Sequence, residues 1–154
     1  MIQITLLMII QILCFLAGSI LIILAGKQDE KTRNPYILIP ALMAIGLSAG
    51  LLTFVMVSIA CIIIFFSPEK INKIIGKADL LLFYSLLVIM MLSQNIILTI
   101  IIILSLAITY ILIKFDKKRL KEVPLISYYA QAYSLTILII IILSIFIGLL
   151  FDGF

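Results

Sequence analysis

The acidic residues of this chain are few, and two of the seven stand where they could do chemistry. Asp29 closely follows the first long apolar run, and Asp79 directly precedes the third, so both are expected at a membrane boundary, on the same side. An ionisable group at that depth is a functional candidate. When two carboxylates approach closely, one keeps its proton; the charged one can then take a proton from water while the neutral one polarises a carbonyl group. Such a pair would suit hydrolysis of a peptide bond.

The composition excludes several other kinds of catalysis. The chain has no His, which excludes Ser-His and Cys-His nucleophilic mechanisms. Its two cysteines, Cys14 and Cys61, lie far apart inside apolar runs, which is typical of small buried hydrophobic residues. A metal site built on His and Cys is therefore excluded, and we expect no metal and no cofactor.

Structural roles for the two aspartates remain open from the residues alone. Asp79 could cap the N-terminus of the helix that it opens, where it would also interact favourably with the helix dipole. Asp29 lies among Lys27, Glu30, Lys31 and Arg33 and could be a solvated loop residue.

The elements that must position these residues are membrane helices. The chain is 66% hydrophobic and 12% charged, with a mean hydropathy of +1.42, whereas a soluble domain is about half apolar and a quarter charged. Charged residues leave four uncharged stretches, 1–26, 34–68, 80–113 and 123–151. A span needs ~20 residues, so the outer stretches fit one helix each. Each middle stretch is too long for one, and we expect breaks at residues 46–50 and at residues 93–95. The sequence thus predicts an all-α, polytopic membrane protein with six transmembrane helices in a single domain, residues 1–154.

The basic residues predict the orientation. All eleven fall within residues 27–33, 70–77 and 114–121. With six spans these segments share one side, whereas with four spans the middle one would face outward, so the positive-inside rule favours six. We therefore expect a multi-pass protein of the cell membrane with cytoplasmic basic loops and both termini outside. The net charge of +4 then reflects topology rather than binding of nucleic acid.

Two further features belong to the cytoplasmic side. Residues 67–76 have an amphipathic pattern, with Ser67 as N-cap, Pro68 at the first helical position and Gly76 as C-cap, which predicts a short interfacial helix before the fourth span. Five of the six tyrosines are expected near the cytoplasmic helix ends as an aromatic belt. They are Tyr36, Tyr110, Tyr128, Tyr129 and Tyr133.

These motifs together resemble the type IV prepilin peptidase and archaeal preflagellin peptidase family, six-helix membrane aspartyl proteases of the GxGD type. Residues 29–35, DEKTRNP, are similar to the family's first-Asp segment, and residues 76–79, GKAD, are similar to its GxGD motif, with Ala78 in place of the second Gly. Residues 123–125, VPL, resemble the stretch that leads into the last helix. The paired-cysteine cytoplasmic domain of bacterial members is absent, so N-methylation is not expected.

The resemblance implies an aspartic endopeptidase that cleaves the short basic leader of pilin- or archaellin-like precursors at the cytoplasmic membrane face. Asp29 and Asp79 would be the catalytic pair, and Gly76 would shape the loop that presents Asp79. Two other functions remain open. One is a non-catalytic membrane subunit or assembly scaffold, and the other is a transporter component, which the interfacial placement of the polar residues disfavours.

Overall fold

The described part of the chain is entirely helical. The computed structural model describes residues 2–32, 36–66, 77–93, 95–116 and 125–151, and within them there are six helices and no strand. The helices are α1 (Ile2–Thr32), α2 (Leu38–Ala49), α3 (Leu51–Phe65), α5 (Lys77–Leu92), α6 (Ile96–Phe115) and α7 (Leu125–Phe151). The predicted interfacial helix at residues 67–76, including Gly76, lies outside the described residues.

Both predicted helix breaks are confirmed. Between α2 and α3, Gly50 has φ +136° and ψ 161°, a backbone conformation that side chains disfavour, and its N–H donates to the carbonyl oxygens of Gly46 and Leu47. Between α5 and α6, the Asn95 side chain accepts hydrogen bonds from the amides of Ile97 (3.1 Å) and Leu98 (3.2 Å) and so caps α6. Each middle apolar stretch therefore folds as two helices.

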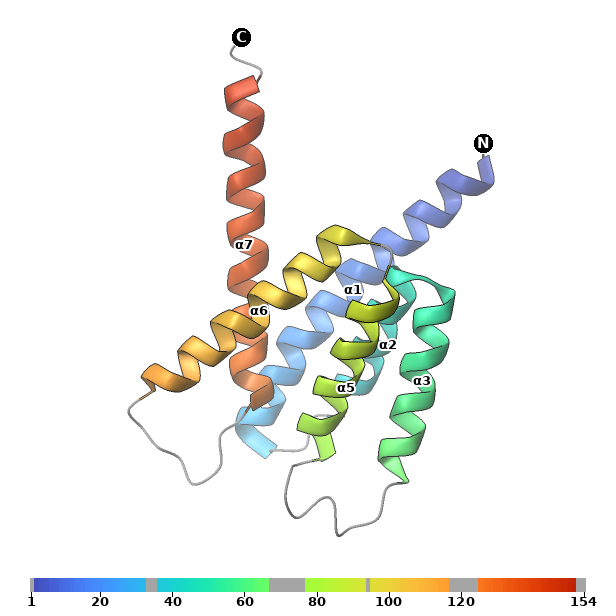
Figure 1. Cartoon of the computed structure of the whole chain (residues 1–154), viewed down its shortest axis with the longest axis vertical. Coiled ribbons are helices and arrows are strands. Elements are labelled where there is room, and N and C mark those ends of the chain that lie inside the picture. The colour runs from blue at the N-terminus through green and yellow to red at the C-terminus, as the bar shows by residue number, and fades with distance from the viewer. Residues whose placement is uncertain (1, 33–35, 67–76, 94, 117–124, 152–154) are drawn as a thin grey trace.

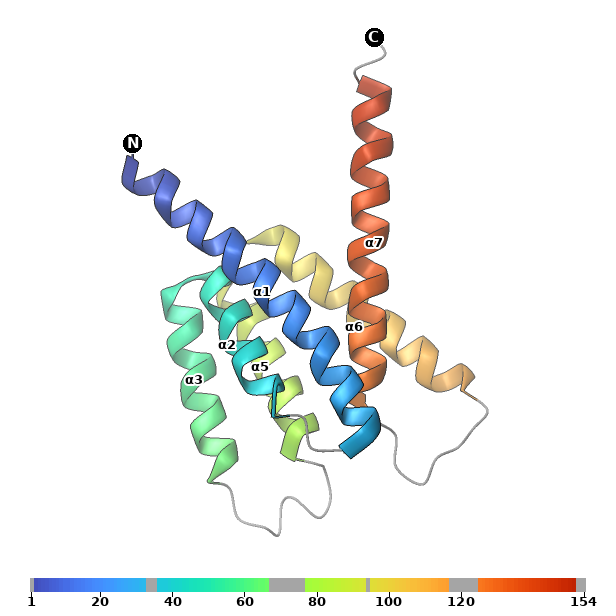
Figure 2. The same ribbon diagram turned by 180° about the vertical axis from the view of Figure 1, so that it is seen from behind.

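The helices alternate in direction, so their ends collect at two ends of the bundle. The end of α1 and the beginnings of α2, α5 and α7 lie at one end, together with the end of α3, whereas the α2–α3 and α5–α6 turns lie at the other (Figures 1 and 2). Helix α1 packs against α2 and α7, α3 packs against α2 and α5, and α6 packs against α7. The helix ends next to the charged segments thus share the end to which Asp29 and Asp79 belong.

Three described helices are long and apolar enough to cross a membrane. They contain the segments Leu6–Asp29, Ile96–Phe115 and Leu125–Ile147. The beginning of α1 and the last half of α7 extend away from the other helices, and both helices carry rows of exposed Leu and Ile side chains. Exposed apolar surface of this extent is unfavourable in water and suits lipid, which indicates a membrane protein.

The tyrosine belt is only partly as expected. Tyr36 and Tyr110 are exposed. Tyr129 and Tyr133 instead face the helix core, with 1% and 0% of their surface exposed, and their rings lie 5.9 Å apart. The prediction was wrong for these two because the face that α7 turns to its neighbours depends on packing, which sequence position alone does not give.

Candidate active site

Asp29 lies in the last turn of α1, packed against the beginning of α7. Only 5% of its surface is exposed, and its Oδ2 accepts a hydrogen bond from the backbone N–H of Ser127 at 3.4 Å. Ser127 is the third residue of α7, and the first N–H groups of a helix have no partner within the helix. The carboxylate therefore satisfies a helix-end donor, and Asp29 is part of the packed structure rather than a solvated loop residue.

A close approach of α1 and α7 brings Asp29 to that donor. A Cβ added at Gly26 would lie 2.4 Å from the Cβ of Ala130, a distance that real Cβ atoms do not adopt. Gly26 is three residues before Asp29, and Ala130 is three residues after Ser127, so the two contacts share one antiparallel register. Farther along the same pair of helices, the hydroxyls of Ser19 and Tyr133 hydrogen-bond at 3.0 Å. Sequence reasoning missed Gly26 and Ser127, although a glycine in an apolar helix is a usual sign of close helix packing.

Asp79 is the third residue of α5, in its first turn. Because α5 begins at Lys77, Asp79 lies inside the helix and is not its N-cap residue, so the expected capping role was wrong. Its place in the first turn still allows a favourable interaction with the helix dipole. Asp79 lies ahead of the apolar segment that starts at Leu80 and is partly exposed. Burial, and secondly the negative charge of Asp29, raise its pKa from 3.8 to about 6. The fold therefore brings the two aspartates, 50 residues apart in sequence, near enough for the charge of Asp29 to contribute to the pKa of Asp79.

This shift predicts a pH dependence of stability. The folded-state pKa of Asp79, about 6, exceeds the ordinary value of 3.8, so between these pH values the folded state binds more protons than the unfolded state. The contribution of Asp79 to stability should be greatest below pH ~4, fall as the pH rises to ~6 and then level off. We expect the fall to be about 1 kcal/mol, less than full linkage gives, because solvent screens a half-buried group. Reversible unfolding in mixed micelles at pH 4 to 7 measures it, and Asp79→Asn should remove this part of the pH dependence. An identical fall in Asp79→Asn would contradict the assignment.

Two other contacts hold chain segments near the pair. The amide of Ile37 donates to Oε1 of Gln28 at 3.3 Å, which ties the beginning of α2 to the last turns of α1. The Tyr128 hydroxyl donates to the Asp116 carboxylate and so joins the end of α6 to the beginning of α7. Both contacts restrict the segments that surround Asp29, and neither was predicted from the sequence.

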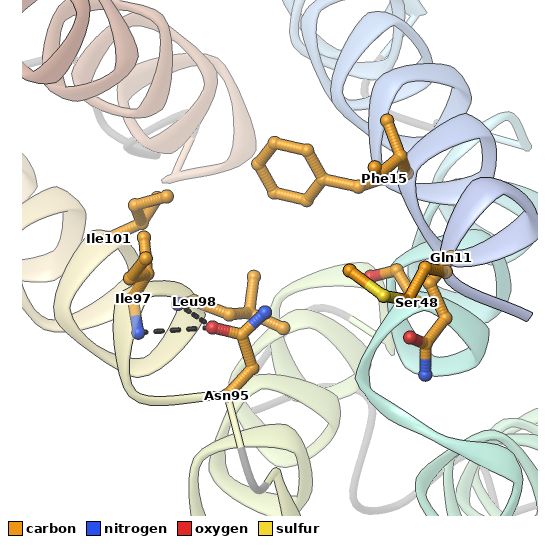
Figure 3. A pocket seen from close by; sticks show the side chains of 9 residues that line it. Gln11, Phe15, Ser48, Asn95, Ile97, Leu98 and Ile101 are labelled. Atoms are coloured by element: carbon orange, nitrogen blue, oxygen red, sulfur yellow. Dashed lines mark hydrogen bonds between the residues drawn. The ribbon is translucent and has the colours of Figure 1, made fainter. Parts of the chain in front are cut away.

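A pocket between described helices lies away from the aspartates. It has a volume of about 320 Å³ and is formed by α1, the end of α2 and the beginning of α6. Gln11, Ser48 and Asn95 supply its polar groups, whereas Phe15 and Leu98 are among its apolar ones (Figure 3). These residues belong to the end of the bundle that carries the α2–α3 and α5–α6 turns. The pocket therefore contributes no group to the aspartate pair.

The remaining candidate groups are Gly76 and the two cysteines. Gly76 lies outside the described residues, so its predicted role in presenting Asp79 stays a prediction. Among the described residues there is no cluster of three His, Cys, Asp or Glu side chains that could hold a metal ion, and Cys14 and Cys61 are both free thiols. Comparison of this chain with protein-family models, with curated proteins and with solved structures finds no match.

Proposed function

We propose that this chain is a membrane aspartyl endopeptidase in which Asp29 and Asp79 form the catalytic pair. The observation that carries the proposal is the placement of these two carboxylates at one end of the bundle, where burial, and secondly the negative charge of Asp29, raise the pKa of Asp79 to about 6. Carboxylates that raise each other's cost of ionisation are typical of acid–base sites that work as a pair. A pair in which one member is charged and the other protonated at mildly acidic pH can cleave an amide.

The reaction has two steps, attack of water and collapse of the intermediate, and each step needs two proton transfers. The ionised carboxylate takes a proton from water as the water oxygen bonds to the scissile carbonyl carbon, and the neutral carboxyl group protonates the carbonyl oxygen. As the resulting tetrahedral intermediate collapses, the second carboxylate recovers its proton from a hydroxyl group and the first protonates the leaving nitrogen. The C–N bond then breaks and both carboxyl groups return to their starting states.

The proposed topology places this site at the cytoplasmic face. In it the six described helices are six spans, the basic segments are cytoplasmic and both termini lie outside. Support comes from the helix ends beside the basic segments, which lie at the same end of the bundle as Asp29 and Asp79. Helices α2, α3 and α5, with 12, 15 and 16 residues, are short for spans of a bilayer about 30 Å thick, so the protein would thin the membrane locally at this face.

The proposed substrate is a pilin- or archaellin-like precursor with a short basic leader before an apolar helix. Such a precursor would place its apolar helix in the bilayer and its cleavage site at the membrane surface, level with the pair. The sequence resemblance to prepilin and preflagellin peptidases supports this substrate class. No cofactor and no nucleic acid takes part in the proposed reaction.

Cleavage by the purified protein tests the proposal. The chain is reconstituted in nanodiscs with a panel of prepilin-like precursors at pH 5 to 7, and mass spectrometry identifies the products. We expect release of the basic leader by a single cut at the membrane-proximal end of the leader. If no precursor of the panel is cleaved by correctly inserted protein, the peptidase proposal fails and a non-catalytic membrane subunit becomes the better reading.

A further inference from the structure

The two aspartates differ in the hydrogen-bond donors around them, and this difference indicates which of them is charged. The amide of Ser127 donates to Asp29 from the first turn of α7, where the aligned peptide dipoles also favour a negative charge. Hydrogen bonds from backbone N–H groups to a carboxylate favour its ionised form. Ser127 is itself 3% exposed, so water competes little for this contact.

The register of α1 and α7 makes this contact a fixed feature. Gly26 against Ala130 sets the spacing of the two helices, and the bond between Ser19 and Tyr133 adds a second fixed point about two turns away along α1. Since the helices run in opposite directions, a one-residue slip would rotate Asp29 away from the first turn of α7. The donor is therefore held in place by the packing of the helix pair and does not depend on a loop.

Asp79 lacks a comparable donor in the described part of the chain, where no hydrogen bond reaches its carboxylate. Its own helix dipole favours the charged form, yet burial and the charge of Asp29 outweigh it and hold its pKa at about 6. Among the residues whose side chains the structure describes, the other titratable groups at these helix ends are Lys27, Tyr36, Lys114, Asp116, Tyr128 and Tyr129. Tyr128 is bonded to Asp116, Tyr129 is buried in the core, and the charge that raises the pKa of Asp79 is that of Asp29.

We propose that the first turn of α7 divides the roles within the pair. The Ser127 N–H holds Asp29 as the ionised carboxylate that takes the proton from water, and Asp79 is the protonated partner that polarises the scissile carbonyl. Ser127 is then a positioning residue that acts through Asp29. This assignment rests on the proposed peptidase function. It gives helix α7 a part in the site, although neither aspartate belongs to that helix.

Proline at position 127 removes the donor and tests the assignment. Ser127→Pro deletes the N–H within the first helical turn, where proline is best tolerated, whereas Ser127→Ala keeps the N–H and removes only the hydroxyl. The rate of precursor cleavage should follow a bell-shaped pH profile whose acidic limb reports ionisation of Asp29. In Ser127→Pro we expect that limb to move up by about one pH unit, the usual scale of one lost hydrogen bond to a charged group. In Ser127→Ala it should stay where the wild type has it.

Two controls keep the outcomes separate. Leu125→Pro places a proline in the same turn without touching the donor and should leave the limb in place. If Ser127→Pro does not insert, a backbone ester at position 127 replaces it, and the same upward shift is required. A wild type that cleaves, combined with an unshifted limb in the donor-deleted protein, overturns the role assignment and leaves the peptidase proposal intact. A wild type that cleaves nothing refutes the proposed function itself.

Discussion

Replacing Asp29 or Asp79 by Asn is expected to reduce precursor cleavage by about 10³-fold or more. Asparagine keeps the size of the side chain and most of its hydrogen bonding, but it cannot exchange the proton that each catalytic step requires. General acid–base groups typically contribute 10²- to 10⁴-fold, and the loss of either member disables both proton transfers of the cycle. The measurement is the initial rate of cleavage in membranes that contain equal amounts of inserted wild type or variant.

Asp116→Asn is the matched control for this loss. Asp116 lies at the same end of the bundle and its substitution removes the same charge, while the amide oxygen of Asn can still accept the bond from Tyr128. We expect its rate to stay within a few-fold of the wild type. If only Asp79→Asn is inactive, the first carboxylate of the pair is not Asp29. Wild-type rates in both Asp29→Asn and Asp79→Asn would show that these aspartates are not the catalytic pair.

The second large effect is expected from a single methyl group between α1 and α7. In Gly26→Ala the new Cβ would lie 2.4 Å from that of Ala130, so the helices must move apart by about 1 Å or more to reach ordinary contact. That movement draws Asp29 away from the Ser127 amide and shifts it relative to Asp79. Because a misplacement of about 1 Å can cost ~10²-fold in rate, we expect cleavage to fall by about that factor.

Two variants test whether spacing is the cause. Gly26→Ala combined with Ala130→Gly moves the methyl group from one helix to the other, restores the space and should recover most of the activity. Gly46→Ala adds a Cβ on α2 at an ordinary 3.4 Å from Phe54 and Val57, and it should have little effect. A Gly26→Ala protein as active as the wild type, or a double variant no better than the single one, would contradict the role given to this contact.

The features of this structure that the sequence predicts are those that depend on interactions between residues close together in the chain. Two apolar runs are too long for one helix, and each is interrupted by a feature that a few neighbouring residues encode. One is the positive φ of Gly50, and the other is the side-chain cap that Asn95 provides for α6. The helical class, the number of described helices and the common end shared by Asp29 and Asp79 were predictable for this reason.

Contacts between distant segments were not predictable in the same way. The bond from Ser127 to Asp29 joins residues 98 positions apart, and it depends on a helix register that a small residue, Gly26, permits. Tyr129 and Tyr133 are buried for the same reason, since α7 turns that face toward the core. The chain pattern gives the position of a residue along a helix, and packing decides which neighbour it meets.

If Asp29 and Asp79 form one electrostatically coupled pair, an infrared titration will show the coupling without any substrate. The protonated carboxyl group of Asp79 gives a carbonyl band that can be isolated as the difference between the wild type and Asp79→Asn. In the wild type this band should disappear with a midpoint near pH 6. In Asp29→Asn the like charge is gone, so the midpoint should move to lower pH while burial still keeps it above 3.8. An unchanged midpoint in Asp29→Asn would show that the charge of one carboxyl group does not affect the other, and the two aspartates would then not act as a pair.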